Sequence, residues 1–256
     1  MIICHKYKFI YIKSMKTAGT SLEIALASFC DENDIISTDE DVEENLKKKL
    51  SRGGQNNLYK IPRVSYRNLK HNIFQSIKLI LIKLGIKFNH KVKFINFLNK
   101  EKFYSHIPAK NVKKIISKNI WDSYYKFTVI RNPVDQIISY YYWCNKSEAE
   151  RSKNPFEVFV KEHSREFFSK QKDIYTFDNE IIVDKCIVFE NFKEELNELS
   201  KKLRLPKNLF EIFNKIRTKN YTRKNKDLSI ASDHTIKNLI KENSSEILNL
   251  HSNFYN

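Results

Sequence analysis

Two short polar segments carry the side chains best suited to hold phosphate or sulfate groups. Residues 16–21 (KTAGTS) combine one lysine, three hydroxyl groups and a glycine, and residues 131–133 (RNP) begin with an arginine. A guanidinium group can donate two hydrogen bonds to one anion, and hydroxyl groups can complete its coordination. Ser139, eight residues after Arg131, adds a further donor. These residue types predict two separate anion sites.

The first segment lies between a predicted strand and a predicted helix. Residues 8–13 (KFIYIK) are short, β-branched and aromatic, which is typical of a strand. Thr20, with Glu23 three residues later, fits a capping box at the start of a helix. A helix N-terminus after a strand attracts anions, because backbone N–H groups and the helix dipole point into the loop. The alternative reading is an ordinary capped helix with a surface lysine.

The second segment has the same setting. A helix is expected over 111–120, and the apolar run 124–130 (YYKFTVI) predicts a buried parallel strand. Pro133 suits the first turn of the helix that follows. Ligands bind at the carboxyl ends of strands in open α/β sheets, which favours Arg131 as an anion ligand. The alternative is that Arg131 pairs with Asp135.

A third strand is predicted at 186–189 (CIVF), with a helix over 192–203 after it. Alternating strands and helices predict an α/β fold with a parallel sheet. Two anion sites on neighbouring strand–helix units then imply one ligand with phosphates at two separated positions.

Composition narrows the class of protein. The 256 residues, 41% of them hydrophobic, suit a single domain covering 1–256 with a real core. A variable, mostly helical insertion is expected at about 45–102. The four cysteines (Cys4, Cys30, Cys144 and Cys186) form no metal or disulfide pattern, so we expect free thiols and no metal site. We expect no transmembrane segment and a cytoplasmic location.

The net charge of +16 suggests an anionic partner, and residues 201–226 hold ten basic residues against one acid, Glu211. Lysine dominates the positive residues, which an AT-rich genome would also produce. The position of the charge therefore matters more than its sum, and no nucleic-acid partner is expected.

Several segments, in order, resemble the sulfotransferases that use 3′-phosphoadenosine 5′-phosphosulfate (PAPS). YIKSMKTAGTSLEIAL resembles their 5′-phosphosulfate loop, and FTVIRNPVDQIISYYYW resembles their 3′-phosphate element. The segments 103–109 (FYSHIPA), 187–192 (IVFENF) and 217–224 (RTKNYTRK) also fit the family's order. The nearest kin by this resemblance are bacterial sulfotransferases and, more distantly, animal carbohydrate 2-O-sulfotransferases. Val134 and Gln136 replace a tryptophan and a basic residue common in the family.

The resemblance implies a P-loop-like three-layer fold, with a central parallel sheet flanked by helices and a helical insertion. It also implies transfer of a sulfo group from PAPS to a hydroxyl acceptor, expected to be a carbohydrate or glycolipid, with adenosine 3′,5′-bisphosphate as product and no metal. His106 would be the general base, with Glu190 as its rival, and Lys16 would stabilise the departing phosphate. The implied nucleotide-binding residues are Lys16, Thr17, Ala18, Gly19, Thr20, Ser21, Arg131, Ser139, Arg217, Tyr221 and Arg223.

Two other functions remain open on the sequence. A P-loop-type nucleotide kinase or phosphotransferase would need a Mg²⁺ site, and no convincing Walker-B-like aspartate follows a predicted strand. In Walker A loops, moreover, the lysine follows the glycine, whereas Lys16 precedes Gly19. A non-enzymatic polyanion binder would use residues 201–226, but it leaves both strand–helix anion motifs unexplained.

Overall fold

The computed structural model describes residues 1–38, 41–50, 52–58, 102–216, 233–252 and 254. The chain divides into two compact units, one of Met1–Asn56 with Tyr104–Asn256 and one of Asn57–Phe103. Every helix and strand given below belongs to the first unit. Most of the insertion predicted at 45–102 lies outside the described residues, because residues 51 and 59–101 are not among them.

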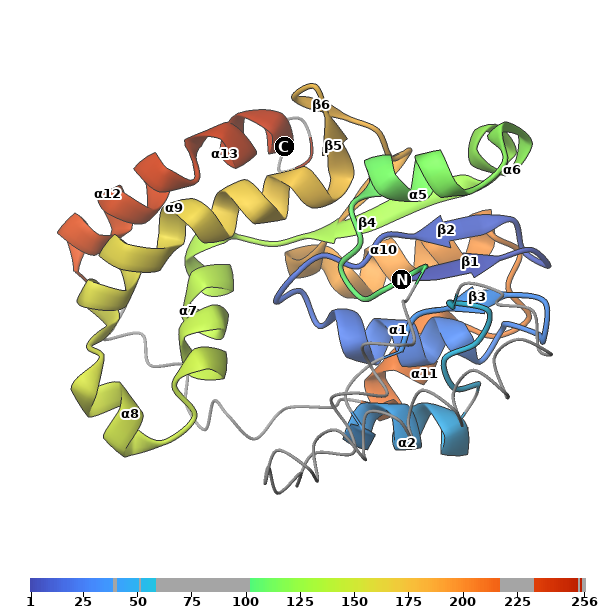
Figure 1. The fold of residues 1–256 in the computed structure, drawn as a ribbon, viewed down its shortest axis with the longest axis horizontal. Helices are drawn as coiled ribbons and strands as arrows, with labels where there is room; N and C mark the ends of the chain where they lie inside the picture. The colour runs from blue at the N-terminus through green and yellow to red at the C-terminus, as the bar shows by residue number, and fades with distance from the viewer. Residues whose placement is uncertain (39–40, 51, 59–101, 217–232, 253, 255–256) are drawn as a thin grey trace, which may run out of the picture. The chain divides into compact units, whose positions relative to one another are not determined.

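The first unit is built on a five-stranded sheet with the order β3-β1-β2-β4-β7 (Figure 1). Strands β2 (Phe9–Tyr11), β4 (Tyr125–Ile130) and β7 (Lys185–Val188) are parallel. Strands β1 (Ile2–Cys4) and β3 (Ile35–Ile36) add antiparallel pairs at one side. The α/β class is confirmed, but the sheet is mixed rather than wholly parallel.

The antiparallel pair has a local cause. Residues 1–12 resemble one continuous strand in sequence, yet the chain turns between Cys4 and Phe9 and folds back as a hairpin. Lys8 has φ 50°, in the left-handed region that such a turn requires. Because β1 reverses direction before β2 begins, only β2 joins the parallel core.

Helices cover both sides of the parallel strands. In Figure 1, α1 (Gly19–Ala27) and α5 (Ala109–Ile115) lie on opposite sides of them. The remaining elements are α2 (Asp41–Leu50), α6 (Lys118–Ser123), α7 (Pro133–Cys144), α8 (Glu148–Lys153), α9 (Phe156–Tyr175), β5 (Thr176–Phe177), β6 (Glu180–Ile181), η1 (Phe189–Asn191), α10 (Phe192–Lys202), α11 (Leu209–Ile216), α12 (His234–Asn243) and α13 (Ser245–His251). No helix within the described ranges is both long and apolar enough to cross a membrane.

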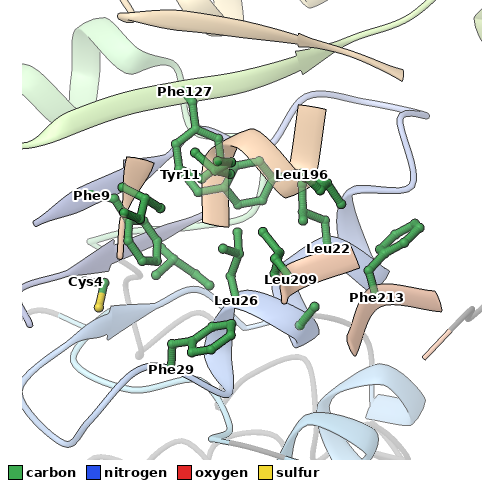
Figure 2. Packing of buried hydrophobic residues seen from close by; sticks show 14 of the residues in the cluster. Cys4, Phe9, Tyr11, Leu22, Leu26, Phe29, Phe127, Leu196, Leu209 and Phe213 are labelled. Carbon is green, nitrogen blue, oxygen red and sulfur yellow. The ribbon is translucent and has the colours of Figure 1, made fainter. Parts of the chain in front are cut away.

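Two apolar clusters hold these elements. Figure 2 shows the first, in which side chains of β1, β2 and β4 meet those of α1, α10 and α11; its members include Phe9, Tyr11, Leu22, Leu26, Phe127, Leu196, Leu209 and Phe213. The second joins α7, α9, α12 and α13 through residues such as Ile137, Tyr141, Phe159, Phe167, Ile240 and Ile247. The first cluster fixes the parallel strands and α1, and the second fixes α7.

Two helix predictions need correction. The helix expected over 111–120 is two helices, α5 and α6, because Ile116 and Ser117 are extended and Ser117 caps α6 through Ile120 N–H. The capping box expected at Thr20 is also wrong. Helix α1 begins at Gly19, and its N-cap is Ala18, which has no side-chain cap. For α7, Asn132 caps the helix and Pro133 occupies its first turn, as predicted.

Candidate functional site

The loops after β2, β4 and β7 meet at the carboxyl edge of the parallel strands. Arg131, directly after β4, donates from Nη1 to the carbonyl oxygen of Lys16 at 3.1 Å. Its guanidinium group lies over the ring of Phe189, 4.5 Å from the centroid. The two segments predicted as anion sites are therefore in direct contact.

The turn after β4 is shaped by the loop after β7. The backbone N–H of Asn132 donates to Oε1 of Glu190 at 2.8 Å. Glu190 was the rival general base, and the structure shows its carboxylate holding a backbone turn. Phe189 thus packs against the guanidinium group of Arg131, and Glu190 holds the backbone directly after it.

Hydrogen bonds to three elements, β4, α7 and α9, hold the loop after β2. The hydroxyl of Ser14 donates to the carbonyl oxygen of Val129 in β4 at 2.6 Å and lies 2.8 Å from Oγ1 of Thr17. Gln136 in α7 donates from Nε2 to the Met15 carbonyl oxygen at 2.7 Å. The Met15 N–H donates to Oε1 of Gln171 in α9 at 3.0 Å. Both glutamines are buried, so this loop is fixed before any ligand arrives.

The backbone of this loop opens onto the N-terminus of α1. Lys16 has φ 59° and Ala18 has φ 56°, so both occupy the left-handed region that non-glycine residues rarely adopt. The first hydrogen bond of α1 runs from Leu22 N–H to the Ala18 carbonyl oxygen at 3.1 Å. A helix N-terminus that follows a parallel strand is the kind of site that binds anions, because its backbone N–H groups and the helix dipole point toward the loop.

Gly19 serves a packing role that the sequence did not indicate. A Cβ added to it would lie 3.0 Å from Cγ of Lys13 and 3.2 Å from the hydroxyl of Tyr11. The absence of a side chain therefore lets buried Lys13 pass beneath the first turn of α1.

Lys13 belongs to a buried charge cluster beneath the loop. Its Nζ lies 2.6 Å from Oε2 of Glu23, which is itself fully buried. Oε1 of Glu23 lies 3.1 Å from Nζ of Lys47 and 3.2 Å from the amino group of Met1. Burial alone raises the pKa of Glu23, but the three ammonium groups outweigh it and hold that pKa well below its usual range. Glu23 therefore anchors α1 instead of capping it.

His106 is hydrogen-bonded to the backbone of Lys13. Its Nδ1 lies 3.0 Å from the carbonyl oxygen of Lys13. Because a carbonyl can only accept, Nδ1 carries the proton and Nε2 holds the free lone pair. Burial, together with the Lys13 ammonium group, lowers the pKa of His106 from 6.5 to about 4. The ring is thus neutral at physiological pH, which is the state a general base needs.

Two predicted ligands lie further from these contacts. The Lys16 ammonium group lies 5.1 Å from the ring centroid of Trp143 in α7, an indole that is 43% exposed. Ser139, also in α7, is half-buried and makes no hydrogen bond to Lys16 or Arg131 in the part of the chain that the structure describes. The predicted residues Arg217, Tyr221 and Arg223 lie outside the described residues.

One group of metal-type side chains occurs within the described residues, away from this edge. The ligand atoms of Cys4, Cys30 and Asp34 lie within 4.8 Å of one another, and all three residues are buried. The Cys4 thiol donates to Asp34 at 3.4 Å, and Asp34 also accepts from the backbone N–H groups of His5 and Asp31. Hydrogen bonding with Cys4, then burial and the neighbouring Asp34, raise the pKa of Cys30 far above its usual range. The four cysteines are free thiols.

Comparison of the chain with protein-family models, curated proteins and solved structures finds no match.

Four residues of the site escaped the sequence reasoning. Gln171 lies 156 positions from its partner, so only the folded chain reveals its contact. Lys13 was predicted only as the end of a strand, and Glu23 only as part of a capping box. Phe189 was predicted only as the end of a buried strand. A usable signal existed for Lys13 alone: a lysine at the end of an apolar strand that enters the core needs a buried acid.

Proposed function

We propose that this protein is a sulfotransferase that transfers a sulfo group from PAPS to a hydroxyl acceptor, with a carbohydrate or glycolipid as the acceptor class. The observation that carries the proposal is the 3.1 Å contact between Arg131 and the Lys16 loop. It joins two anion-binding turns on adjacent parallel strands, and a nucleotide phosphorylated at both ends needs such a pair. A P-loop-like assignment of the fold belongs to the same proposal.

The 5′ end of the donor occupies the N-terminus of α1. Its phosphate accepts from backbone N–H groups at the start of α1 and from the hydroxyl groups of Thr20 and Ser21, and the helix dipole favours its charge. The Thr17 hydroxyl instead holds the loop through Ser14. Arg131, stacked on Phe189 and directed by Glu190, provides the fork for the 3′-phosphate. Ser139 contributes a hydroxyl from the second turn of α7.

The transfer step needs in-line geometry and charge stabilisation. The acceptor oxygen forms a bond to sulfur while the bond from sulfur to the 5′-phosphate oxygen breaks. The acceptor proton passes to Nε2 of His106, and the electron pair of the broken bond stays on adenosine 3′,5′-bisphosphate. Lys16 leaves its place over Trp143 to neutralise that developing charge.

A transfer assay tests the proposal. Purified protein is incubated with labelled PAPS and a panel of glycans, glycolipids and small alcohols, and label in the acceptor is measured. The expected result is transfer that Lys16→Ala and His106→Gln each reduce by at least about 100-fold, the usual scale for one electrostatic or acid–base group. Glu190→Gln is the matched control and retains most activity. Transfer that instead requires ATP and Mg²⁺ contradicts the proposal and identifies a phosphotransferase.

A further inference from the structure

The strongest unexplained feature beside the site is the buried Lys13. It is 2% exposed, and its stem passes beneath Gly19 in the first turn of α1. Its two polar ends have different partners. The carbonyl oxygen accepts from Nδ1 of His106 at 3.0 Å, and the ammonium group meets Glu23 at 2.6 Å. A single residue therefore links the candidate base to helix α1.

We propose that Lys13 is the positioning residue of the site: its carbonyl oxygen fixes the tautomer of His106, and its ammonium group, held by Glu23, keeps Nε2 of that ring free of a proton. This inference rests on the proposed function for the identity of the proton donor, a substrate hydroxyl. The arrangement of Lys13, Glu23 and His106 does not depend on it.

The first part follows from hydrogen bonding. His106 has φ 60°, a left-handed conformation that places its ring against the strand end and costs about 1 kcal/mol. The bond to the Lys13 carbonyl oxygen offsets that cost only if Nδ1 keeps its proton. The tautomer with Nδ1–H is thus favoured, and Nε2 is left as the basic nitrogen.

The second part follows from charge. Besides burial, three charges act on the pKa of His106, and all three belong to the buried cluster beneath the loop: the Lys13 ammonium group, the Met1 amino group and the Glu23 carboxylate. Lys13 and the Met1 amino group disfavour an imidazolium, and Glu23 favours it, but Glu23 is surrounded by three ammonium groups that offset its charge. Removing Lys13 or Glu23 must therefore move the pKa of His106 in opposite directions.

The experiment is an NMR titration of the histidine rings in the full chain. Nitrogen-15 shifts at neutral pH report the tautomer, and His106→Gln assigns the resonance. Wild type is expected to show Nδ1–H and a pKa well below 6.5. Lys13→Met, which keeps the apolar stem, is expected to raise the pKa of His106 by on the order of one unit, and Glu23→Gln to lower it.

Two controls accompany the variants. His251 is an internal reference, because burial alone lowers its pKa to about 4. Lys126→Met removes another buried lysine, paired with Asp184 at 2.9 Å, that does not face His106. Neither the His251 titration in Lys13→Met nor the His106 titration in Lys126→Met should shift.

An Nε2–H tautomer, a wild-type pKa at or above 6.5, or shifts of the same sign in the two variants would each overturn the proposal. The tautomer and the wild-type pKa need no variant, so they decide the matter even if Lys13→Met does not fold. If the proposed function is wrong, the wild-type protein transfers no sulfo group although these titrations behave as expected. Where transfer occurs, the acid limb of kcat/KM moves to higher pH in Lys13→Met.

Discussion

At the residue scale, the site holds three of the eight described non-glycine residues whose φ is positive. Lys16, Ala18 and His106 all have positive φ, and none is a glycine. Asp178 and Asn179 have it too, but they form the turn between β5 and β6, where such residues are common. The loop after β2 therefore holds a conformation that its own residues disfavour, and the surrounding hydrogen bonds maintain it.

This strain predicts an unusual response at Ala18. Ala18→Gly removes the Cβ from a left-handed position, so stability should rise by up to about 1 kcal/mol. Ala18→Val places a β-branched side chain there and should lower stability by more than about 1 kcal/mol. Urea denaturation followed by circular dichroism measures both.

The matched control lies at the other end of α1. Ala27→Gly, at the buried last residue of this helix, where the backbone is right-handed, should lower stability by up to about 1 kcal/mol. If Ala18→Gly is as destabilising as Ala27→Gly, the left-handed strain assigned to the loop is wrong.

At the scale of elements, helix α9 takes part in the site although none of its residues was a predicted ligand. Gln171 →Met leaves the Met15 N–H without its acceptor, so stability should fall by about 1–3 kcal/mol. Because the same bond holds the loop after β2, affinity for adenosine 3′,5′-bisphosphate should fall as well. Chemical denaturation and calorimetry measure the two effects.

Ser164→Ala separates the two effects. Ser164 also lies in α9, is buried, and accepts from Asn243 in α12 at 2.8 Å, away from the loop. Its loss should reduce stability and leave nucleotide affinity unchanged. Equal losses of affinity in both variants would show that α9 acts only through global stability.

The sequence predicted the positions of most strands and helices, but not the reversal of the chain between β1 and β2. The strands at 9–11, 125–130 and 185–188 and the helix at 192–202 fall within a residue or two of prediction, because apolar runs are local signals. The β1–β2 hairpin was missed, since its turn (HKYK) lacks glycine, asparagine and proline. The buried charges of Lys13 and Glu23 were missed because their pairing depends on how β2 and α1 pack.

For the whole molecule, the proposed function depends on how the sheet converges. Three parallel strands bring their loops to one edge, and each loop supplies a different part of the proposed site: the N-terminus of α1, the Arg131 guanidinium group, and the ring and carboxylate that support Arg131 and its turn. The net charge of +16 adds a long-range attraction for a polyanionic nucleotide that salt should screen. The specific contacts, by contrast, should distinguish the two ends of the ligand.

Calorimetric binding of two nucleotides tests this claim most directly. Wild type should bind adenosine 3′,5′-bisphosphate about 10- to 100-fold more tightly than adenosine 5′-monophosphate, the worth of one charge-assisted contact to the 3′-phosphate. Arg131→Ala should bring that ratio close to one, whereas Lys16→Ala should weaken both ligands and keep the ratio. No saturable binding of the bisphosphate, or a ratio that Arg131→Ala leaves intact, would contradict a shared nucleotide site.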